Sequence, residues 1–275
     1  MSGIGTQSSL TRATPVQPRS APDALPSIEI RARFIRVLQR LAFYGAYFIF
    51  GGLGVITSLV CLIPARFLDS RRSHHFGQEL IHKLFRFFTW YLRTFGLLHV
   101  DASGIAGLRD EQGIILVANH PSLLDAVLVT AQQPRLFCLM KADLAHNIVL
   151  SGQSRLAGYV HNKSAVGLIK ACTARISEGS NFLVFPEGTR SKGRLGVFKM
   201  GFTLLACTLR RPVQTIIIRF DQSYLSKGWP FLQAPDFPVR CSLCLGRRFE
   251  PLAATDARSF GKQIEDYMRE MVDTP

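Results

Sequence analysis

The chain has 275 residues, of which 47% are hydrophobic, and it carries a formal net charge of +14 at pH 7. This length suits one catalytic domain with appendages, and the apolar fraction is ample for a core but too low for a membrane protein with many spans. The excess of 33 Lys and Arg over 19 Asp and Glu indicates an anionic partner: a membrane surface, a nucleic acid or a phosphorylated substrate. The 20 phenylalanines favour lipid among these three.

Residues 1–28 are rich in Ser, Thr, Pro, Ala and Gly without periodicity, which predicts a disordered leader. No apolar core follows the first residue, so the segment lacks the pattern of a secretory signal. Residues 29–75 combine basic residues with an uncharged apolar run over 41–63. As a helix this run measures about 35 Å, enough to cross a hydrocarbon core of about 30 Å. We expect it to anchor the chain in a membrane, either spanning the bilayer or dipping in and returning; a buried helix of a soluble domain is the alternative.

The segment 76–95 has the pattern of an amphipathic helix. Its apolar residues follow helical spacing, and Lys83, Arg86 and Arg93 supply positive charge on the polar side. Aromatic and cationic residues together suit a helix that lies in the headgroup layer of a bilayer. Packing against a domain core is as compatible with the pattern, and both hold if the helix lies between the domain and the bilayer.

Beyond residue 96, short apolar segments alternate with helical ones. We expect strands over 97–101, 114–118, 135–141, 181–185, 213–220 and 239–245, and helices over 122–131, 166–178, 202–209 and 260–271. This alternation predicts an α/β fold with a mostly parallel sheet flanked by helices, in a domain over 76–275.

Cys241 and Cys244 form the only close pair among six cysteines. They lie in a segment that alternates like a strand, in which residues three apart point to opposite faces. We therefore expect buried, reduced cysteines in a reducing compartment, and neither a disulfide nor a metal site.

The first chemical motif, Asn119-His-Pro-Ser-Leu-Leu-Asp125, directly follows the apolar run 113–118. Ser122 and Asp125 have the spacing of a capping box, so we expect a helix that begins with Ser122 as its N-cap. His120 then lies in the turn before the helix, where the Asp125 carboxylate can reach its imidazole. A carboxylate on one ring nitrogen leaves the other as a base near neutral pH. A helix cap beside an ordinary surface histidine is the alternative.

The second motif, Pro186-Glu-Gly-Thr-Arg-Ser191, follows the apolar run 182–185 and again joins a strand to a glycine-bearing turn. Ligands bind at the carboxyl ends of strands in α/β sheets. Four cationic residues lie within the ten residues 190–199, namely Arg190, Lys192, Arg194 and Lys199. Because Arg and Lys bind phosphate oxygens, and turn amides add donors, the segment predicts a phosphate site. A solvated basic loop is the alternative.

Several other chemistries do not fit the sequence. Gly188 and Gly193 have the spacing of a P-loop, but Arg194 and Leu195 stand where Lys and Ser or Thr are required. The chain has no G-x-S-x-G of a serine hydrolase and no G-x-G-x-x-G after a strand. Signatures of nucleic-acid binding modules are not evident.

Together the two motifs resemble those of the glycerolipid acyltransferase family, whose best-known members are the 1-acylglycerol-3-phosphate acyltransferases. His120 to Asp125 matches the family's H-x-x-x-x-D block, Phe185 to Ser191 matches its second block nearly letter for letter, and Phe198 to Gly201 matches the F-K-x-G that usually follows. The resemblance covers residues 76–252. It implies the glycerol-3-phosphate acyltransferase-like form of the α/β fold and an N-terminal membrane-anchoring helical segment.

The resemblance also implies acyl transfer from acyl-CoA or acyl-carrier protein to a lysophospholipid hydroxyl, most simply that of 1-acyl-sn-glycerol-3-phosphate. It gives His120 the role of general base and Asp125 that of its partner. Further residues are expected to shape the acceptor site or bind its anionic groups: Glu187, Gly188, Thr189, Arg190, Lys141, Arg194 and Lys199. No metal or resident cofactor is implied, and no nucleic acid. The expected location is the cell inner membrane, with the catalytic domain on the cytoplasmic side and held to anionic lipid.

Two departures from the family pattern leave the acceptor open. Asn162 stands where many relatives have Arg, and Thr215 replaces the second proline of a late block. They motivate other acceptors, such as a lyso-ornithine lipid, another lysophospholipid, or a pigment or specialised lipid. A catalytically inactive membrane scaffold is the alternative of another class, against which the intact His120 and Asp125 argue.

Overall fold

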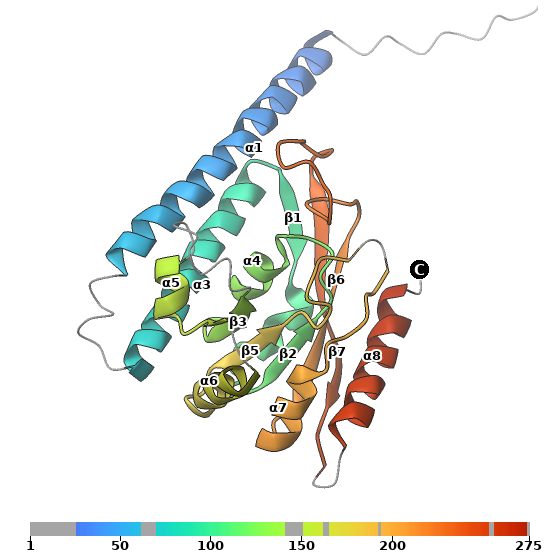
Figure 1. The fold of residues 1–275 in the computed structure, drawn as a ribbon. Helices are drawn as coiled ribbons and strands as arrows, with labels where there is room; N and C mark the ends of the chain where they lie inside the picture. The colour runs from blue at the N-terminus through green and yellow to red at the C-terminus, as the bar shows by residue number, and fades with distance from the viewer. Residues whose placement is uncertain are drawn as a thin grey trace, which may run out of the picture. The chain divides into compact units, whose positions relative to one another are not determined.

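The computed structural model describes residues 26–61, 70–140, 151–161, 165–191, 194–252 and 256–273 (Figure 1). Residues 1–37 and 38–275 form two compact units. The described part of the first unit is helical and begins α1 (Pro26–Val60). The predicted leader therefore falls almost wholly outside the described residues, and the domain boundary expected at residue 76 stays a prediction.

One seven-stranded sheet forms the centre of the second unit, in the order β1-β7-β6-β2-β5-β3-β4. Every neighbouring pair is parallel except β6 and β7, which are antiparallel. The predicted α/β fold with a mostly parallel sheet is thus confirmed. The strands are β1 (Leu98–Asp101), β2 (Ile115–Ala118), β3 (Leu136–Met140), β4 (Val160–His161), β5 (Asn181–Val184), β6 (Val213–Phe220) and β7 (Val239–Phe249).

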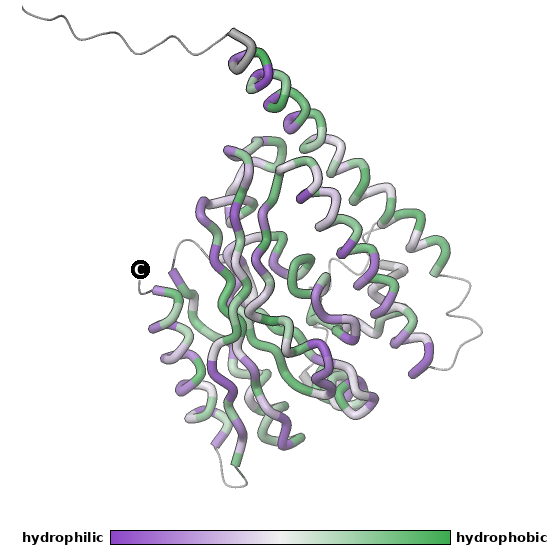
Figure 2. The backbone as a smooth tube through the Cα atoms, turned by 180° about the vertical axis from the view of Figure 1, so that it is seen from behind, coloured by the Kyte–Doolittle hydropathy of each residue, from purple (hydrophilic) through white to green (hydrophobic). Residues whose placement is uncertain are grey.

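Helices cover both faces of this sheet, because successive residues of its buried strands point to opposite sides. Leu116 of β2 packs in one core, whereas Ile115 and Val117 pack in the other. The first core contains residues of α1 from Ala42 onward and of α3, η1 and α4, and the second contains α6, α7 and α8. These elements are α3 (Ser70–Thr94), η1 (Ser103–Leu108), α4 (Asp125–Thr130), α6 (Ala165–Ser177), α7 (Gly201–Leu209) and α8 (Ala257–Asp273), with α5 (Ser151–Leu156) in addition. Figure 2 shows the pattern: green, hydrophobic segments run through the middle of the sheet, whereas α8 alternates between hydrophobic and hydrophilic residues.

Polar side chains line much of the buried face of α3. Gln78 donates to the carbonyl of Ala157 (3.1 Å) and to Ser180 Oγ (3.0 Å), and His82 Nδ1 lies 2.8 Å from the carbonyl of Thr130. Apolar contacts complete the same face with Ile81, Phe88 and Leu92. Phe87 and Trp90 are exposed on other sides of the helix. The predicted amphipathic helix is therefore present, and it begins six residues earlier than expected.

All six cysteines are free thiols. Cys241 is buried and Cys244 is half-buried, as the alternation of a strand predicts. Sequence patterns did not indicate α5, β4 or η1, which are short.

The close approach of α3 to the turn after α5 yields a stability test. A Cβ on Gly77 would lie 2.4 Å from the amide nitrogen of Ala157, whereas one on Gly52 of α1 meets nothing within 4 Å. We expect Gly77→Ala to lower the free energy of unfolding by about 1–3 kcal/mol through overpacking. Gly52→Ala, the matched control, should be neutral or slightly stabilising because Ala favours helix. Thermal unfolding in detergent solution measures both, and an unchanged melting temperature for Gly77→Ala would contradict this docking.

Candidate active site

The two motifs meet because their strands are neighbours. β2 pairs with β5 in parallel register, so the segments that follow both strands emerge at the same edge of the sheet. Asn119, directly after β2, donates to the carbonyl of Ile218 and accepts from its amide, both at 2.8 Å. This buried side chain continues the pairing with β6 and fixes the start of the turn that carries His120.

His120 and Asp125 form the predicted pair. His120 Nδ1 lies 2.8 Å from Asp125 Oδ2, and the same oxygen accepts the amide of Ser122 at 2.8 Å. The imidazole stacks on the ring of Phe185, with the centroids 4.3 Å apart and the planes 22° from parallel. The His120 side chain is 18% exposed, and Asp125 is fully buried. Since Nδ1 is held by the carboxylate, Nε2 is the nitrogen available as a base.

The helix start differs from the prediction. α4 begins at Asp125, and its N-cap is Leu124, which makes no side-chain capping bond. Ser122 instead lies in the preceding turn, where its hydroxyl accepts the amide of Leu124 at 3.2 Å. As in a capping box, the Asp125 carboxylate accepts the amide of Ser122. This bond closes the turn before α4, however, and does not lie in the first turn of the helix.

The environment of Asp125 opposes its ionisation. Burial raises the pKa of the Asp125 carboxyl to about 6, against the lowering effect of His120 and of the Ser122 amide. Within the described chain, Oδ1 has no hydrogen-bond partner. In the described structure the Asp125 carboxyl therefore makes its hydrogen bonds through Oδ2 alone, to His120 and to the Ser122 amide.

Glu187 of the second motif binds the first motif directly. Its Oε1 accepts the backbone amide of His120 at 3.0 Å and the hydroxyl of Ser191 at 3.2 Å, and its Oε2 accepts the amide of Gly196 at 2.8 Å. Ser191 also donates its amide to the carbonyl of His120 at 2.7 Å. Glu187 is buried, so these bonds position the two turns against each other. Its expected contact with the acceptor stays a prediction.

Gly188 adopts a left-handed conformation with φ of 66°. A Cβ at this position would lie 2.7 Å from Lys199 Nζ, so the lysine side chain lies directly over the turn. The amide of Lys199 donates to the carbonyl of Pro186 at 2.8 Å, which fixes this arrangement. Lys199, Thr189 and Arg194 are exposed, as a site for an anionic ligand requires.

Arg190 is hydrogen-bonded to a loop whose contact with this site the sequence patterns did not indicate. Its Nη1 donates to the carbonyls of Leu225 (2.7 Å) and Ser226 (3.0 Å) in the connection from β6 to β7. The carbonyl of Leu225 also accepts a hydrogen bond from the amide of Leu123 at 3.1 Å. Leu123 lies between His120 and Asp125 in the sequence, and these two residues are called the dyad below. The guanidinium is thus oriented by backbone oxygens, and no chemical motif in the 221–226 segment could have signalled this.

The remaining predicted positions have other outcomes. Lys141, Asn162 and Lys192 lie outside the described residues. Thr215 is buried in β6, where its hydroxyl donates to the carbonyl of Arg247 at 2.8 Å. A Cβ on Gly246 would lie 2.4 Å from Thr215 Oγ1, and the register of β6 and β7 shifts at this point. Thr215 therefore has a structural role at an irregularity of the sheet, and it no longer argues for an unusual acceptor.

Metal chemistry has no visible site: over the described ranges, no group of three or more His, Cys, Asp and Glu side chains is placed to hold an ion.

Comparison with known proteins agrees with this geometry. Residues 99–219 match the model of the Acyltransferase family, a segment that contains both motifs. This match spans under half of the chain and, with the curated relatives, supports the glycerolipid acyltransferase family.

Two curated relatives have different acceptors in their names. A 1-acyl-sn-glycerol-3-phosphate acyltransferase of Helicobacter pylori is 30% identical over 133 residues, covering 45% of this chain and 55% of the relative. A lyso-ornithine lipid O-acyltransferase of Pseudomonas aeruginosa is 30% identical over 151 residues, covering 53% and 56%. The chain spans about half the length of these curated relatives.

A solved structure supports the fold. The crystal structure of the 1-acyl-sn-glycerophosphate acyltransferase of Thermotoga maritima matches with a TM-score of 0.63 and 23% identity, covering 88% of this chain and 96% of that one.

The raised pKa of Asp125 predicts how stability depends on pH. An unfolded aspartate titrates near pH 3.9, so between about pH 4 and 6 the folded state binds more protons than the unfolded state. The free energy of unfolding then falls as pH rises through this window, by up to roughly 3 kcal/mol. We expect Asp125→Asn to flatten this dependence and to be at least as stable as the parent at pH 7.5. Thermal unfolding from pH 4 to 8 measures it, with the exposed Asp110→Asn as control; an equal loss of stability at every pH would contradict the assignment.

Proposed function

We propose that the protein transfers a fatty acyl group from acyl-CoA or acyl-carrier protein to the free hydroxyl of a lysophospholipid. The foremost acceptor is 1-acyl-sn-glycerol-3-phosphate, and the product is then phosphatidic acid. The observation that carries the proposal is the hydrogen bond between His120 and a fully buried Asp125. Glu187 holds the backbone of His120 against the turn 187–190, which carries Arg190 and is called the cationic turn below.

In the proposed reaction, His120 Nε2 takes the proton of the acceptor hydroxyl as its oxygen attacks the thioester carbonyl. Asp125 holds the ring and stabilises the imidazolium that forms. The carbon–sulfur bond of the resulting tetrahedral intermediate breaks, and the imidazolium returns the proton to the leaving thiolate. No covalent enzyme intermediate is needed. Arg190, oriented by two carbonyls, would hold the acceptor phosphate, with Lys199 and Arg194 adding positive charge.

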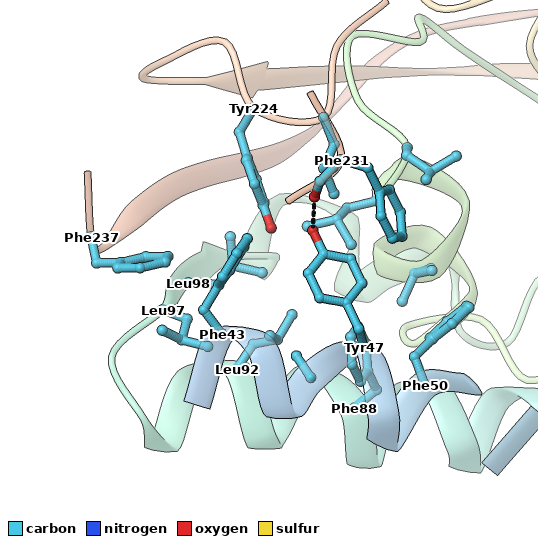
Figure 3. A pocket seen from close by; sticks show the side chains of 15 residues that line it. Phe43, Tyr47, Phe50, Phe88, Leu92, Leu97, Leu98, Tyr224, Phe231 and Phe237 are labelled. Carbon is cyan, nitrogen blue, oxygen red and sulfur yellow. Dashed lines mark hydrogen bonds between the residues drawn. The ribbon is translucent and has the colours of Figure 1, made fainter. Parts of the chain in front are cut away.

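An apolar cavity beside the dyad suits the acyl chain. It has a volume of about 120 Å³ and is lined by Leu123, Leu124 and Val127 on the dyad side. Figure 3 shows its opposite wall, where aromatic side chains of α1 and α3 face the loop after β6. Apolar pockets with few polar groups are typical of lipid-chain sites.

The length and composition of α1 support attachment to a membrane. The helix from Glu29 to Val60 is long and apolar enough to cross a bilayer, judged by length and composition. From Ala42 onward one side of the helix is buried, because Ala42, Phe43 and Ala46 belong to the first core. This packing favours attachment along the surface over a separate spanning helix. We place the enzyme at the cytoplasmic face of the inner membrane, held to anionic lipid by its positive charge.

A lyso-ornithine lipid is the second candidate acceptor. The Pseudomonas relative named for that acceptor and the Helicobacter relative named for 1-acyl-sn-glycerol-3-phosphate have the same sequence identity to this chain, 30%. A lyso-ornithine lipid has a carboxylate in place of the phosphate, so Arg190 would meet less negative charge, and a panel of acceptors separates the two candidates.

The direct test is an acceptor panel with purified full-length protein. Both donor types are assayed with 1-acyl-sn-glycerol-3-phosphate, other lysophospholipids and lyso-ornithine lipid, and the products are identified by mass spectrometry. We expect transfer to the lysophosphatidate, reduced about 10²–10⁴-fold in His120→Ala with the fold intact. Activity of His120→Ala within a factor of ten of the parent would remove the base from the mechanism, and transfer to no acceptor at all would overturn the proposal.

Glu187→Gln separates positioning from acceptor contact. The amide replaces one acceptor oxygen by a donor that faces the amide of His120 or Gly196. We expect kcat to fall roughly 10–100-fold with little change in either KM, because the buried bonds orient the dyad. Ser191→Ala, which removes one donor to the same carboxylate, is the milder control. A raised acceptor KM with unchanged kcat would show instead that Glu187 binds substrate.

A further inference from the structure

Residues 221–238, here called the strap, connect β6 to β7 and touch both the dyad and α1. At the dyad, the carbonyl of Leu225 accepts bonds from Leu123 and Arg190. At α1, the hydroxyl of Tyr47 donates to the carbonyl of Phe231, and that of Tyr44 donates to the carbonyl of Leu232 at 3.4 Å. The same loop therefore contacts the catalytic turn and the helix expected at the membrane.

The strap also closes one side of the apolar cavity. Tyr224, Leu225, Phe231 and Phe237 all line it, and Figure 3 shows Tyr224 and Phe231 extending toward Tyr47 from the side opposite α1. Burial raises the pKa of the Tyr224 phenol, consistent with its position in an apolar wall. Moving the strap would open this wall.

The tip of the strap has the composition of a membrane-inserting loop. It reads Lys227-Gly-Trp-Pro-Phe-Leu232, in which Phe231 is 57% exposed and Leu232 is 63% exposed. Two adjacent exposed apolar side chains beside Trp and Lys are typical of segments that enter the interface of a bilayer. Phe231 lines the cavity and is also exposed at the surface.

This apolar tip is continuous with exposed apolar residues of α1. Tyr44, which bonds the tip, lies between Leu41 and Phe48 on one helical face, and all three are exposed. A contiguous apolar surface of this kind marks an interaction site. Aromatic belts, a flanking lysine and a net charge of +14 fit an anionic lipid bilayer as its partner.

We propose that the strap tip inserts into an anionic lipid bilayer together with this face of α1, so that the cavity opens to the bilayer beside Phe231. An acyl chain can then pass between the bilayer and the cavity without crossing water. The passage of the chain rests on the proposed acyl transfer, whereas the insertion of the tip does not.

The test measures insertion without substrate. In the full-length chain with Trp90→Phe and Trp229→Phe, a single tryptophan is introduced as Leu232→Trp, or as Val166→Trp on α6 for the control. Val166 is 80% exposed and belongs to the opposite side of the sheet. With vesicles of phosphatidylglycerol and phosphatidylethanolamine whose acyl chains are brominated, we expect strong quenching and a blue shift for position 232 and little change for position 166.

Three results would overturn the proposal: vesicle-bound Leu232→Trp protein whose fluorescence is not quenched, equal quenching in the Leu232→Trp and Val166→Trp proteins, or no binding of the parent chain to these vesicles. Shielding of position 232 by a second copy of the chain would give the first of them. Since the readout is fluorescence, failure of the tip to insert is distinguishable from failure of acyl transfer.

A second pair of variants connects insertion to turnover. Leu232→Glu should weaken vesicle binding about tenfold through loss of one buried leucine, and raise the apparent KM for vesicle-borne acceptor similarly, while Val166→Glu changes neither. Activity of Leu232→Glu on a short-chain, water-soluble acceptor should be retained. Loss of activity on both the vesicle-borne and the water-soluble acceptor would indicate that Leu232→Glu misfolds the strap. The quenching measurement with Leu232→Trp then decides whether the tip inserts.

Discussion

The carboxylate of Glu187 joins two turns that lie 67 residues apart in the chain. It can do so only because β2 and β5 are adjacent and parallel, which brings the segments after both strands to one edge of the sheet. Three donors satisfy its two oxygens, so the buried charge is stabilised and the backbone of His120 is held in place. The positions of the dyad and of the cationic turn both depend on this one set of bonds.

Asp125 and Glu187 are both buried carboxylates, yet their surroundings differ. Glu187 accepts hydrogen bonds on both oxygens, whereas Asp125 uses one oxygen and leaves the other without a partner in the described structure. Glu187 also raises the pKa of Asp125 through charge repulsion, in addition to the larger effect of burial. Asp125 bonds the imidazole of His120, whereas Glu187 bonds its backbone amide, so the two carboxylates position the same residue at different atoms.

The sequence predicted the features that depend on local pattern. β2, β5 and β6 are mostly apolar, and their bounds agree with the expected ones within one residue at every end. The pairing of His120 with Asp125 followed from spacing across a turn. The helix start did not, because Ser122 satisfies the Leu124 amide in a turn and leaves α4 to begin at Asp125.

Contacts between distant segments could not be predicted in the same way. The bond from Arg190 to Leu225 joins the second motif to a loop without any motif, and its physical basis is a backbone carbonyl that every residue type supplies equally. Thr215 shows the converse: a residue that departs from the family pattern was open to a functional interpretation, but its hydroxyl satisfies a carbonyl where two strands lose register.

The apolar run of α1 shows why length and hydropathy alone leave the mode of attachment open. The helix from Glu29 to Val60 is long enough to span a bilayer, but Phe43 and Ala46 are buried in the first core. Leu41, Tyr44 and Phe48 are exposed on one face, and Tyr44 and Tyr47 donate hydrogen bonds to the strap. A helix fixed in this way holds the cavity and the dyad at a constant distance from whatever surface it lies on. For the proposed reaction, whose acceptor and acyl chain would both reside in lipid, that constant distance would remove the need to extract either substrate fully into water.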